Sequence, residues 1–378
     1  MPVLIDSQDT HTPMEAALAQ AWRSLHHTSP NPRVGCIITT ADGQVLGQGH
    51  TQQAGGPHAE IMALRDAAAA GHEVRGATAY VTLEPCAHQG RTGPCCDALI
   101  AAGIGRVVAS IKDPNPLVGG KGFARLRAAG VQVEVGPGAQ ESRELNIGFF
   151  SRMVRGTPWV RLKVAASLDG ATALHNGASQ WITSPEARAD GHAWRARACA
   201  ILTGSGTVLA DNPRLDVRAL PTLRQPQAVV VDSHLQTPPD ALLFAAQRGV
   251  LIYTSSHQDT PFLQRQAALQ ARGATVVALP SPDGRVDLAA MLRDLGQRGI
   301  NELHVEAGQR LNGALLRAGL VDELLLYLAP LLLGSGRGMT DLGPLETLAQ
   351  GQALEFGPVE RVGNDLRVLA RLPGRAHF

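Results

Sequence analysis

The fold of this chain is decided by two stretches, PHAEIMAL at residues 57–64 and LEPCAHQGRTGPCC at residues 83–96. Together they contain His58, Glu60, Cys86 and Cys95. A zinc ion with three protein ligands keeps a fourth position for water and lowers the pKa of that water to roughly 7. If His58 opens a helix, Glu60 lies in the first turn of that helix, beside the metal but free to carry protons.

Zinc nucleobase deaminases have the pattern H-x-E followed by P-C-x-x-C, in which the Glu is a general acid and base and not a ligand. Here the second cysteine comes later, because eight residues separate Cys86 from Cys95. The alternative is a structural zinc site, which is normally closed by a fourth Cys or His. Cys96 or His88 would supply that fourth ligand.

The other cysteines indicate no further chemistry. Five is an odd number, and the N-terminus does not resemble a signal peptide, so a disulfide framework is not expected. Cys36 and Cys199 lie in apolar runs and are interpreted as small buried side chains.

Length and composition narrow the class of protein. A chain of 378 residues is too long for one typical core, so two domains are expected. The net charge is +1 and only 4% of the residues are aromatic, which argues against a nucleic-acid partner and for a small-molecule substrate. No apolar run approaches the length of a membrane span. We expect a cytoplasmic protein that does not contact membranes.

Strands and helices alternate along the chain, which is typical of α/β folds with helices on both faces of a sheet. The stretch Arg155-Gly156-Thr157-Pro158 contains helix breakers and predicts a linker. The expected domains are residues 1–155 and 156–378. In the first domain the two zinc-binding segments are predicted to be helix N-termini that meet at one end of the sheet.

Polar residues follow several predicted strands of the second half. Gly204-Ser205-Gly206-Thr207 and the stretch from Gly308 to Gly313 each follow a strand, and backbone N–H groups at a helix N-terminus can bind anions. Plain turn glycines are the alternative interpretation. Charged residues lie at or beside strand ends, where α/β sheets bind ligands: Lys163, Asp169, Arg195, Asp211, Arg218 and Glu306. This pattern favours a nucleotide or phosphate ligand.

Longer sequence motifs lie along most of the chain. They are Asn31-Pro32-Arg33-Val34-Gly35-Cys36, Gly56-Pro57-His58-Ala59-Glu60, Thr82-Leu83-Glu84-Pro85-Cys86, Gly90-Arg91-Thr92, Lys112-Asp113-Pro114-Asn115-Pro116, Ser167-Leu168-Asp169-Gly170, Gln180-Trp181-Ile182-Thr183 and Val305-Glu306-Ala307-Gly308. With these motifs, residues 14 to about 370 resemble the bifunctional deaminase/reductase of bacterial riboflavin biosynthesis.

The resemblance implies an α/β protein with a cytidine-deaminase-like αβα sandwich followed by a dihydrofolate-reductase-like α/β domain. It implies that His58, Cys86 and Cys95 bind Zn²⁺ and that Glu60 transfers protons in catalysis. The choice of Cys95 over Cys96 as a ligand comes from the family motif alone.

The resemblance also implies the remaining site residues. In the deaminase domain, the residues expected to bind substrate are Asn31, Arg91, Asp113 and Asn115. In the reductase domain, the residues expected to contact NADPH are Ala165, Trp181, Thr207, Asp211, Ser233, Gly308, Gln309, Arg310, Leu311, Asn312, Gly313 and Ala314. The residues expected to bind the substrate of that domain are Lys163, Ser179, Arg195, Leu215, Arg218 and Glu306.

The implied function has two steps on a phosphoribosyl pyrimidine. Deamination of 2,5-diamino-6-(5-phosphoribosylamino)pyrimidin-4-one is followed by NADPH-dependent reduction of the ribosyl group to ribityl. Either Lys163 or Asp211 would assist proton transfer in the reduction, and either Arg195 or Arg218 would bind the phosphate. The protein is expected to be a homo-oligomer.

Two other functions compete with this one. The first is a zinc deaminase of another base or nucleotide, with the second half as a nucleotide-binding module. The second is a zinc-stabilised binding or regulatory protein, but a structural zinc site does not require Glu60.

Overall fold

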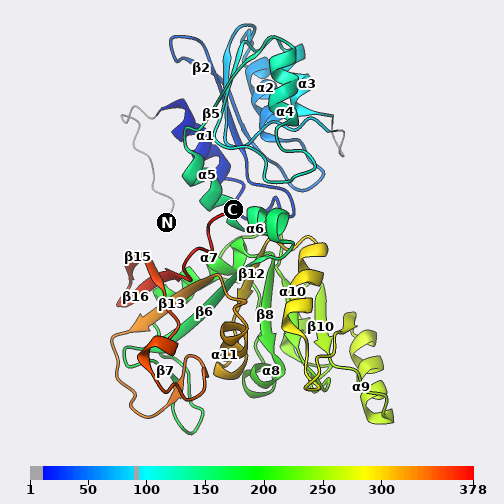
Figure 1. The fold of residues 1–378 in the computed structure, drawn as a ribbon, viewed down its shortest axis with the longest axis vertical. Helices are drawn as coiled ribbons and strands as arrows, with labels where there is room; N and C mark the ends of the chain where they lie inside the picture. Colours follow the sequence, from blue (N-terminus) through cyan, green and yellow to red (C-terminus); the bar gives the residue numbers. More distant parts are fainter. Residues whose placement is uncertain (1–11, 89–92) are drawn as a thin grey trace. The chain divides into compact units, whose positions relative to one another are not determined.

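The structure is a computed structural model, and it describes residues 12–88 and 93–378. The chain divides into two compact units, with the boundary between Arg155 and Gly156 (Figure 1). Each unit has its own sheet and its own candidate site.

The first unit alternates strands and helices. In chain order its elements are α1 (Pro13–Trp22), β1 (Gly35–Thr39), β2 (Val45–His50), α2 (Ala59–Ala69), β3 (Thr78–Val81), α3 (Cys95–Ala101), β4 (Arg106–Ala109), α4 (Lys121–Ala128), β5 (Gln132–Val135), α5 (Ala139–Leu145) and α6 (Ile147–Arg155).

The five strands of this unit form one mixed sheet in the order β2-β1-β3-β4-β5. The pairs β1–β2 and β1–β3 are antiparallel, whereas β3–β4 and β4–β5 are parallel. Helices α1 and α5 lie on one face of the sheet, and α2, α3 and α4 lie on the other (Figure 1). The predicted αβα sandwich is therefore present.

Local sequence explains where these helices begin. At α1, Thr12 and Glu15 form a capping box, and Pro13 occupies the first turn. At α2, His58 is the N-cap residue and Glu60 lies in the first turn. At α3, Cys95 is the first helical residue. The prediction that the two zinc-binding segments are helix N-termini is confirmed for His58 and Cys95.

Glycines on β2 allow α2 to approach the sheet closely. A Cβ added to Gly49 would lie 2.5 Å from the Ala63 nitrogen, and one added to Gly47 would lie 2.3 Å from the Ala63 oxygen. Both distances are far below contact distance, so the helix backbone rests directly on the strand backbone.

The second unit is larger and is built around a longer sheet. Its elements are β6 (Trp159–Ser167), β7 (Ala171–Ala173), α7 (Pro185–Arg197), β8 (Ala200–Gly204), α8 (Ser205–Asp211), β9 (Gln227–Val231), the 3₁₀ turn Leu242–Phe244, β10 (Val250–Thr254), α9 (Thr260–Ala271), β11 (Ala274–Ala278), α10 (Leu288–Gln297), β12 (Glu302–Val305), α11 (Gln309–Arg317), β13 (Glu323–Ala329), β14 (Arg337–Gly338), the 3₁₀ turn Leu348–Gln350, β15 (Glu355–Val362) and β16 (Asp365–Arg371).

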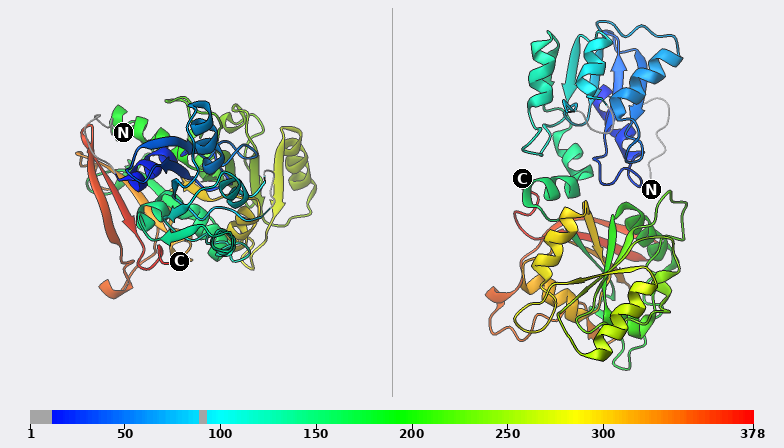
Figure 2. Two further views of the ribbon diagram at one scale, coloured as in Figure 1. Left: turned by 90° about the horizontal axis from the view of Figure 1, so that it is seen from above. Right: turned by 90° about the vertical axis from the view of Figure 1, so that its right-hand side faces the viewer.

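Nine of these strands form a twisted sheet in the order β11-β10-β9-β8-β12-β6-β13-β16-β15 (Figure 2). The strands from β11 to β13 are parallel, and β16 and β15 continue the sheet as an antiparallel hairpin. Apolar side chains of β6, β8 and β12 pack against α10 and α11 on one face. Helices α8 and α9 cover the other face at β9 and β10, and α7 covers it at β13.

The sequence predicted most of these elements, in some cases with the bounds that the structure has. The sequence predicts helices over residues 185–197 and 288–297, and the structure confirms both at both ends as α7 and α10. The helices α5, α6 and α8 and the strands β7, β14 and β15 were not predicted. Every residue of β15 except Val362 is exposed, so this strand lacks the alternation of apolar and polar residues that identifies a half-buried strand.

No helix in residues 12–88 or 93–378 is long and apolar enough to cross a membrane.

Candidate functional site

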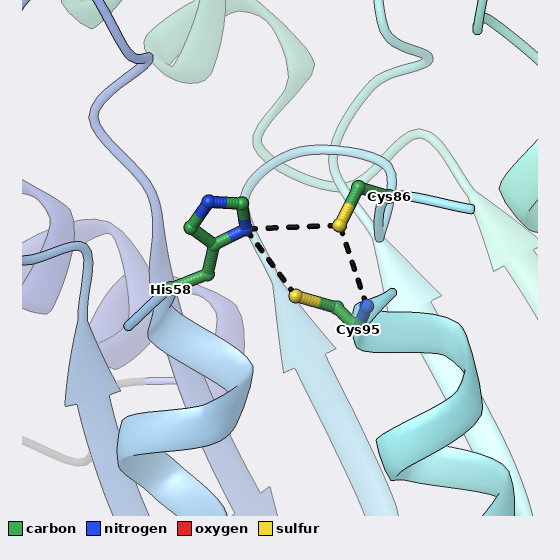
Figure 3. A group of neighbouring side chains, drawn as sticks. All are labelled: His58, Cys86 and Cys95. Atoms are coloured by element: carbon green, nitrogen blue, oxygen red, sulfur yellow. Dashed lines mark hydrogen bonds between the residues drawn. The ribbon is translucent and has the colours of Figure 1, made fainter. Parts of the chain in front are cut away.

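Three side chains of the first unit converge at the N-termini of α2 and α3. His58 Nδ1 lies 3.7 Å from Cys86 Sγ and 3.4 Å from Cys95 Sγ (Figure 3). Each ligand atom lies within 4.8 Å of the other two. In the part of the chain that the structure describes, this is the one group of three or more His, Cys, Asp or Glu side chains close enough to hold a metal ion.

The spacing and chemistry of these atoms fit zinc. Zinc–sulfur and zinc–nitrogen bonds at the tetrahedral angle place a sulfur and a nitrogen ligand about 3.5 Å apart. Cys96 does not join the group, because its Sγ donates to the carbonyl oxygens of Pro85 and Gly122 at 3.2 and 3.5 Å. His88 is exposed and also stays outside the group. A site with three ligands matches a catalytic zinc centre better than a closed structural one.

The surroundings favour a thiolate at Cys86 but not at Cys95, whose pKa is raised by its hydrogen bond to Cys86 and by burial. The backbone N–H of Cys95 donates to Cys86 Sγ at 3.3 Å. Hydrogen bonding from Cys95 and from His58 lowers the pKa of the Cys86 thiol well below its usual range. Because the thiolate is the form that binds metal, this environment favours zinc uptake.

Glu60 lies beside the ligands without being one of them. Its side chain is 3% exposed, and it lines the same cavity as His58 and Cys86. Burial, together with the nearby Cys86 thiolate, raises the pKa of Glu60 to about 7 in the absence of a metal. A carboxyl group with such a pKa can both accept and release a proton near neutral pH.

The cavity beside these residues has a volume of about 450 Å³. Three of the four side chains predicted to bind the substrate of this domain line it, namely Asn31, Asp113 and Asn115. The fourth, Arg91, lies outside the described residues. Burial raises the pKa of Asp113 to about 6.

The second unit has a cluster of charges around Glu306, just after β12. Arg195 of α7 donates from Nε and Nη2 to the two carboxylate oxygens of Glu306, at 2.5 and 2.8 Å. Lys163 Nζ of β6 lies 4.0 Å from Glu306 Oε2. The structure therefore brings together three residues that the sequence placed on separate elements.

The pKa values of this cluster follow from burial and pairing. Burial alone would raise the pKa of Glu306, but Arg195 and Lys163 hold it well below its usual range. Burial lowers the pKa of Lys163, although Glu306 partly opposes this change. Glu306 is thus fixed as a carboxylate, whereas Lys163 gives up its proton more readily than an exposed lysine.

The loop after α8 brings Leu215 and Arg218 to the same cluster. Arg195 Nη1 donates to the Asp216 carbonyl oxygen at 3.1 Å, which joins the loop to α7. The Asp216 carboxylate accepts from Arg218 Nη1 at 2.9 Å. Leu215 is buried with φ +50°, and its carbonyl oxygen accepts from Arg248.

Two loops at the carboxyl ends of β8 and β12 lie side by side. A Cβ added to Gly308 would lie 3.8 Å from Thr207 Oγ1, and one added to Gly204 would lie 3.4 Å from Leu311 Cδ2. Both loops lead directly into helices, α8 and α11, so their backbone N–H groups are available to an anionic group. This arrangement fits the phosphates of a dinucleotide such as NADPH.

Within the predicted cofactor segment, the residues differ in exposure. Gly308 and Arg310 are exposed, and Gln309, Leu311 and Ala314 are partly buried. Asn312 is 1% exposed, and its Nδ2 donates to the carbonyl oxygens of Ala307 and Met339 at 3.1 and 3.0 Å. Gly313 is buried, and a Cβ there would lie 1.9 Å from the Asp341 oxygen. Asn312 and Gly313 therefore support the turn from inside the fold.

The other predicted residues of this unit lie around the same end of the sheet or on the segment before α7. Ser233 follows β9, and its carbonyl oxygen accepts from Ser255 Oγ at 2.6 Å. Asp211 ends α8 and is exposed. Ala165 of β6 pairs with Tyr327 of β13. Ser179 and Trp181 lie between β7 and α7, where Trp181 is 67% exposed and stacks under the guanidinium of Arg188.

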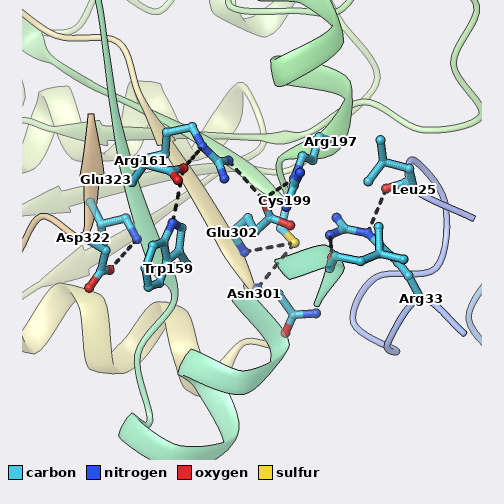
Figure 4. Close-up of polar contacts among 12 residues, drawn as sticks. Leu25, Arg33, Trp159, Arg161, Arg197, Cys199, Asn301, Glu302, Asp322 and Glu323 are labelled. Carbon is cyan, nitrogen blue, oxygen red and sulfur yellow. Dashed lines mark hydrogen bonds and ion pairs between the residues drawn. The ribbon is translucent and has the colours of Figure 1, made fainter. Parts of the chain in front are cut away.

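A cluster of buried charged side chains lies on the face of the sheet that α7 covers. Arg161 is 2% exposed and donates to Glu323 at 2.6 Å and to Glu302 at 3.0 Å (Figure 4). Its guanidinium also lies 4.5 Å from the centre of the Trp194 ring, on the helix turn that carries Arg195. Arg197 of α7 donates to the same Glu302 at 2.8 Å, so the cluster joins α7 to the sheet.

Sequence reasoning missed three residues that shape these sites. Asp216 and Arg248 hold the Leu215–Arg218 loop, but as single charged residues outside any motif they give no recognisable signal. Glu84 is buried beside the zinc ligands and accepts hydrogen bonds from four backbone N–H groups. Its place directly before Pro85-Cys86 was a signal that could have identified it.

Comparisons with known proteins assign both units to families. Residues 7–111 match the family described as the cytidine and deoxycytidylate deaminase zinc-binding region. Residues 158–368 match the family described as the RibD C-terminal domain. Together these matches confirm the predicted fold class, a cytidine-deaminase-like domain followed by a reductase domain.

Curated relatives match over nearly the whole chain. The riboflavin biosynthesis protein RibD of Escherichia coli (strain K12) is 48% identical over 358 residues, which cover 93% of this chain and 96% of that protein. The RibD of Aquifex aeolicus is 38% identical over 353 residues, with 93% and 96% coverage. The two-domain length is therefore shared with these relatives.

Solved structures of the same architecture agree. Acinetobacter baumannii RibD matches with a TM-score of 0.86 and 40% identity, covering 95% of this chain and 97% of that one. A Thermotoga maritima protein described as a diaminohydroxyphosphoribosylaminopyrimidine deaminase/5-amino-6-(5-phosphoribosylamino)uracil reductase matches with a TM-score of 0.84 and 31% identity, at the same coverage. These matches favour two enzymatic domains over a deaminase joined to a binding module.

Proposed function

This chain belongs to the RibD family of bifunctional deaminase/reductases of riboflavin biosynthesis, and on that premise we propose which of its residues carry out each reaction. Zinc and NADPH are the cofactors of the two reactions. The observation that supports the assignment best is the convergence of His58, Cys86 and Cys95 on the cavity that Glu60 also lines.

For deamination, we propose that His58, Cys86 and Cys95 hold the zinc ion. Zinc with an open fourth position supplies a water of lowered pKa, the nucleophile that replaces the amino group of the pyrimidinone. Glu60 accepts the proton of this water at its carboxylate and returns it to the departing ammonia. Its place on the cavity wall beside His58 and Cys86 supports both transfers.

Asn31, Asp113 and Asn115 are proposed to bind the substrate of this reaction. All three line the cavity beside Glu60, and they offer the hydrogen-bond donors and acceptors that a pyrimidinone ring requires. Arg91 is proposed for the same role from the family motif alone.

For the reduction, we propose that NADPH binds along the loops after β8 and β12. The close approach of Thr207 to Gly308 supports this position, and Ala165, Trp181, Asp211, Ser233 and the α11 N-terminus are the proposed neighbours. NADPH supplies the hydride that reduces the anomeric carbon of the opened ribosyl group.

Lys163 is proposed as the proton donor in this step, in preference to Asp211. Lys163 is partly buried beside Glu306 and its pKa is lowered by burial, which favours proton release to the substrate. Asp211 is exposed at the end of α8.

Arg218 is proposed to bind the substrate phosphate, in preference to Arg195. The Arg218 side chain is 52% exposed, whereas Arg195 already donates to both oxygens of Glu306 and to the Asp216 carbonyl oxygen. An arginine with exposed donors can make the bidentate contact that phosphate favours. Ser179 and Leu215 are proposed to contact the same substrate.

We also propose that the protein is a cytoplasmic homo-oligomer. A cytoplasmic location agrees with five free cysteines, two of which are proposed zinc ligands.

The edge strand β15 supports self-association, because Phe356 and Val359 on it are 78% and 54% exposed. Light scattering on wild type and on Phe356→Lys would test this: an oligomer that dissociates in the variant is expected, and a monomeric wild type would contradict it.

The test of the two reactions follows NADPH oxidation by purified protein supplied with the phosphoribosylated diaminopyrimidinone, beside Glu60→Ala. We expect oxidation by wild type, none by the variant, and restoration of oxidation in the variant by already deaminated substrate. Release of ammonia without NADPH oxidation would contradict the reductase assignment and leave the deaminase assignment standing.

A further inference from the structure

Glu84 is a buried carboxylate on the wall of the deaminase cavity, and neither proposed reaction gives it a role. It follows β3 and precedes the zinc ligand Cys86 by two residues, and it is 5% exposed. No lysine or arginine among the described residues forms an ion pair with it. Burying a carboxylate costs free energy unless hydrogen bonds satisfy it, so the hydrogen-bond partners of Glu84 show what it stabilises.

Among the described residues, the Glu84 carboxylate accepts from four backbone N–H groups, all of one segment. Oε2 accepts from Asp113 at 3.1 Å and from Gly120 at 2.8 Å. Oε1 accepts from Gly122 at 2.8 Å and from Phe123 at 3.2 Å. The segment runs from the end of β4 to the first turn of α4, where a negative charge also favours the helix N-terminus.

This segment forms one wall of the deaminase cavity. Asp113, Asn115 and Val118 all line the cavity that contains Glu60. Between them, the Asn115 N–H donates to Asp113 Oδ1 at 2.8 Å, and the Leu117 N–H donates to Asn115 Oδ1 at 3.0 Å. These are local turns, so they shape the loop but do not fix its position against the zinc ligands.

The start of α4 is also packed tightly against the ligand loop. A Cβ added to Gly122 would lie 2.0 Å from the Pro85 carbonyl oxygen and 3.1 Å from Glu84 Oε1. Cys96 donates to the carbonyl oxygens of both Pro85 and Gly122. Glu84 is therefore at the point where the segment with Cys86 and the segment with Asp113 meet.

We infer that Glu84 is a positioning residue of the deaminase: its carboxylate fixes the 113–123 segment at a set distance from the zinc ligands, and thereby holds Asp113 and Asn115 where they meet the substrate. This inference rests on the proposed substrate-binding roles of Asp113 and Asn115. The inference adds a role for the Glu84 carboxylate, which keeps Asp113 and Asn115 at a fixed position relative to the metal ligands.

The test is Glu84→Gln in the full-length, zinc-loaded protein. The amide oxygen can still accept from one pair of N–H groups, but the amide nitrogen faces the other pair and cannot accept. We expect KM for the diaminopyrimidinone to rise roughly ten-fold, which corresponds to the loss of one charge-assisted hydrogen bond. The kcat is expected to stay within about three-fold of wild type, because contacts equal in ground and transition state change KM alone.

Two measurements separate positioning from general loss of structure. The zinc content per chain and the reduction of already deaminated substrate are expected to match wild type. Glu134→Gln is the matched control, since Glu134 lies on β5 of the same unit, half-exposed and paired with Arg106. A folded Glu84→Gln protein with wild-type KM, or one that loses zinc and kcat together, would overturn the inference.

Asp113→Asn and Asn115→Ala separate this inference from the proposed function. If both variants keep wild-type KM, the proposed substrate roles fail. If they raise KM and Glu84→Gln does not, only the inference about Glu84 fails. In a double variant with Asn115→Ala, Glu84→Gln is expected to add less than it does alone.

Hydrogen exchange in the wild-type protein gives an answer even if Glu84→Gln does not fold. The amides of Asp113, Gly120 and Gly122 are expected to exchange as slowly as those of β4, because the buried carboxylate holds them. Exchange as fast as that of exposed loop amides would overturn the inference.

Discussion

The two units build their polar sites from different materials. In residues 12–155, one imidazole and two thiols from two short segments lie within 4.8 Å of one another, ready for a metal ion. In residues 156–378, a lysine of β6 and an arginine of α7 both pair with one glutamate just after β12. With an ion bound as proposed, the first site would concentrate its charge in that ion, whereas the second distributes charge over three side chains. In the first unit, the proposed proton carrier Glu60 can therefore be replaced alone. In the second unit, replacing one charged side chain leaves its partners without their ion pair.

The largest expected effect follows from the replacement Glu60→Gln. Removing a general acid and base costs roughly 10²- to 10⁴-fold in rate, so deamination should nearly cease. Zinc content should be unchanged because Glu60 is not a ligand, and reduction of deaminated substrate should continue. The measurement is ammonia release together with metal analysis, with Glu73→Gln, an exposed position in the same unit, as the control. Full deaminase activity in Glu60→Gln would show that Glu60 is not the proton carrier, and the contrast between the two units would fail.

A second effect is expected from Glu306→Gln in the other unit. The change leaves Arg195 and Lys163 without their carboxylate. The three side chains are 14–22% exposed, so the cost lies below the roughly 3–5 kcal/mol of a fully buried pair. We expect reductase activity to fall on the order of 100-fold and the thermal transition of this unit to fall as well, with deamination unchanged. The exposed Glu346→Gln is the control. Loss of activity without loss of stability would mean that Glu306 is not held by its neighbours as the structure indicates.

The pH dependence of reduction sharpens the comparison further. The pKa of Lys163 is lowered from the ordinary 10.5 by burial, so the ammonium loses its proton at a lower pH than an exposed lysine does. If Lys163 donates the proton, the reduction rate falls as the pH rises through this lowered pKa. Lys163→Arg should lower the reduction rate and remove that alkaline limb, since a guanidinium stays protonated and donates no proton. A limb at the same pH in both proteins would assign it to another group.

The smallest effect is expected from Arg218→Ala. Loss of one exposed phosphate contact should raise KM in the reduction roughly ten-fold, equivalent to about 1.4 kcal/mol. A substrate that lacks the phosphate should show no difference between variant and wild type. Arg214→Ala is the matched control, because Arg214 also pairs with Asp216 and is similarly exposed. Equal effects of the two changes would indicate that they act only through Asp216.

The same difference between the units explains what the sequence could predict. His58, Cys86 and Cys95 lie in two short stretches with fixed spacing, and a metal ion imposes that spacing, so the ligands follow from the motif. Lys163, Arg195 and Glu306 are far apart in the sequence, and each alone resembles a solvated charge at a strand end. Their association depends on strand order, which places β12 beside β6, and sequence pattern does not specify that order.

The strands and helices themselves were mostly predictable because their apolar periodicity is strong. The missing elements show the limit of that signal. Strand β15 is exposed along nearly its whole length, and α8 has only Val208 buried, so neither carries the apolar period of a packed element. Tertiary pairing creates β15: it extends the sheet by hydrogen bonds to β16.

The bare backbone of Gly49 has a consequence for how this chain can change. Helix α2 rests on Gly49 through Ala63, and the N-terminus of the same helix carries His58 and Glu60. A methyl group at position 49 would lift the helix and move the ligand and the proton carrier together, without altering any residue of the site. We therefore expect the catalytic geometry to depend on residues that do not contact the substrate. In a library of variants, alanine at 49 should inactivate deamination as a lone change, and restoration of activity should be sought among second changes in α2.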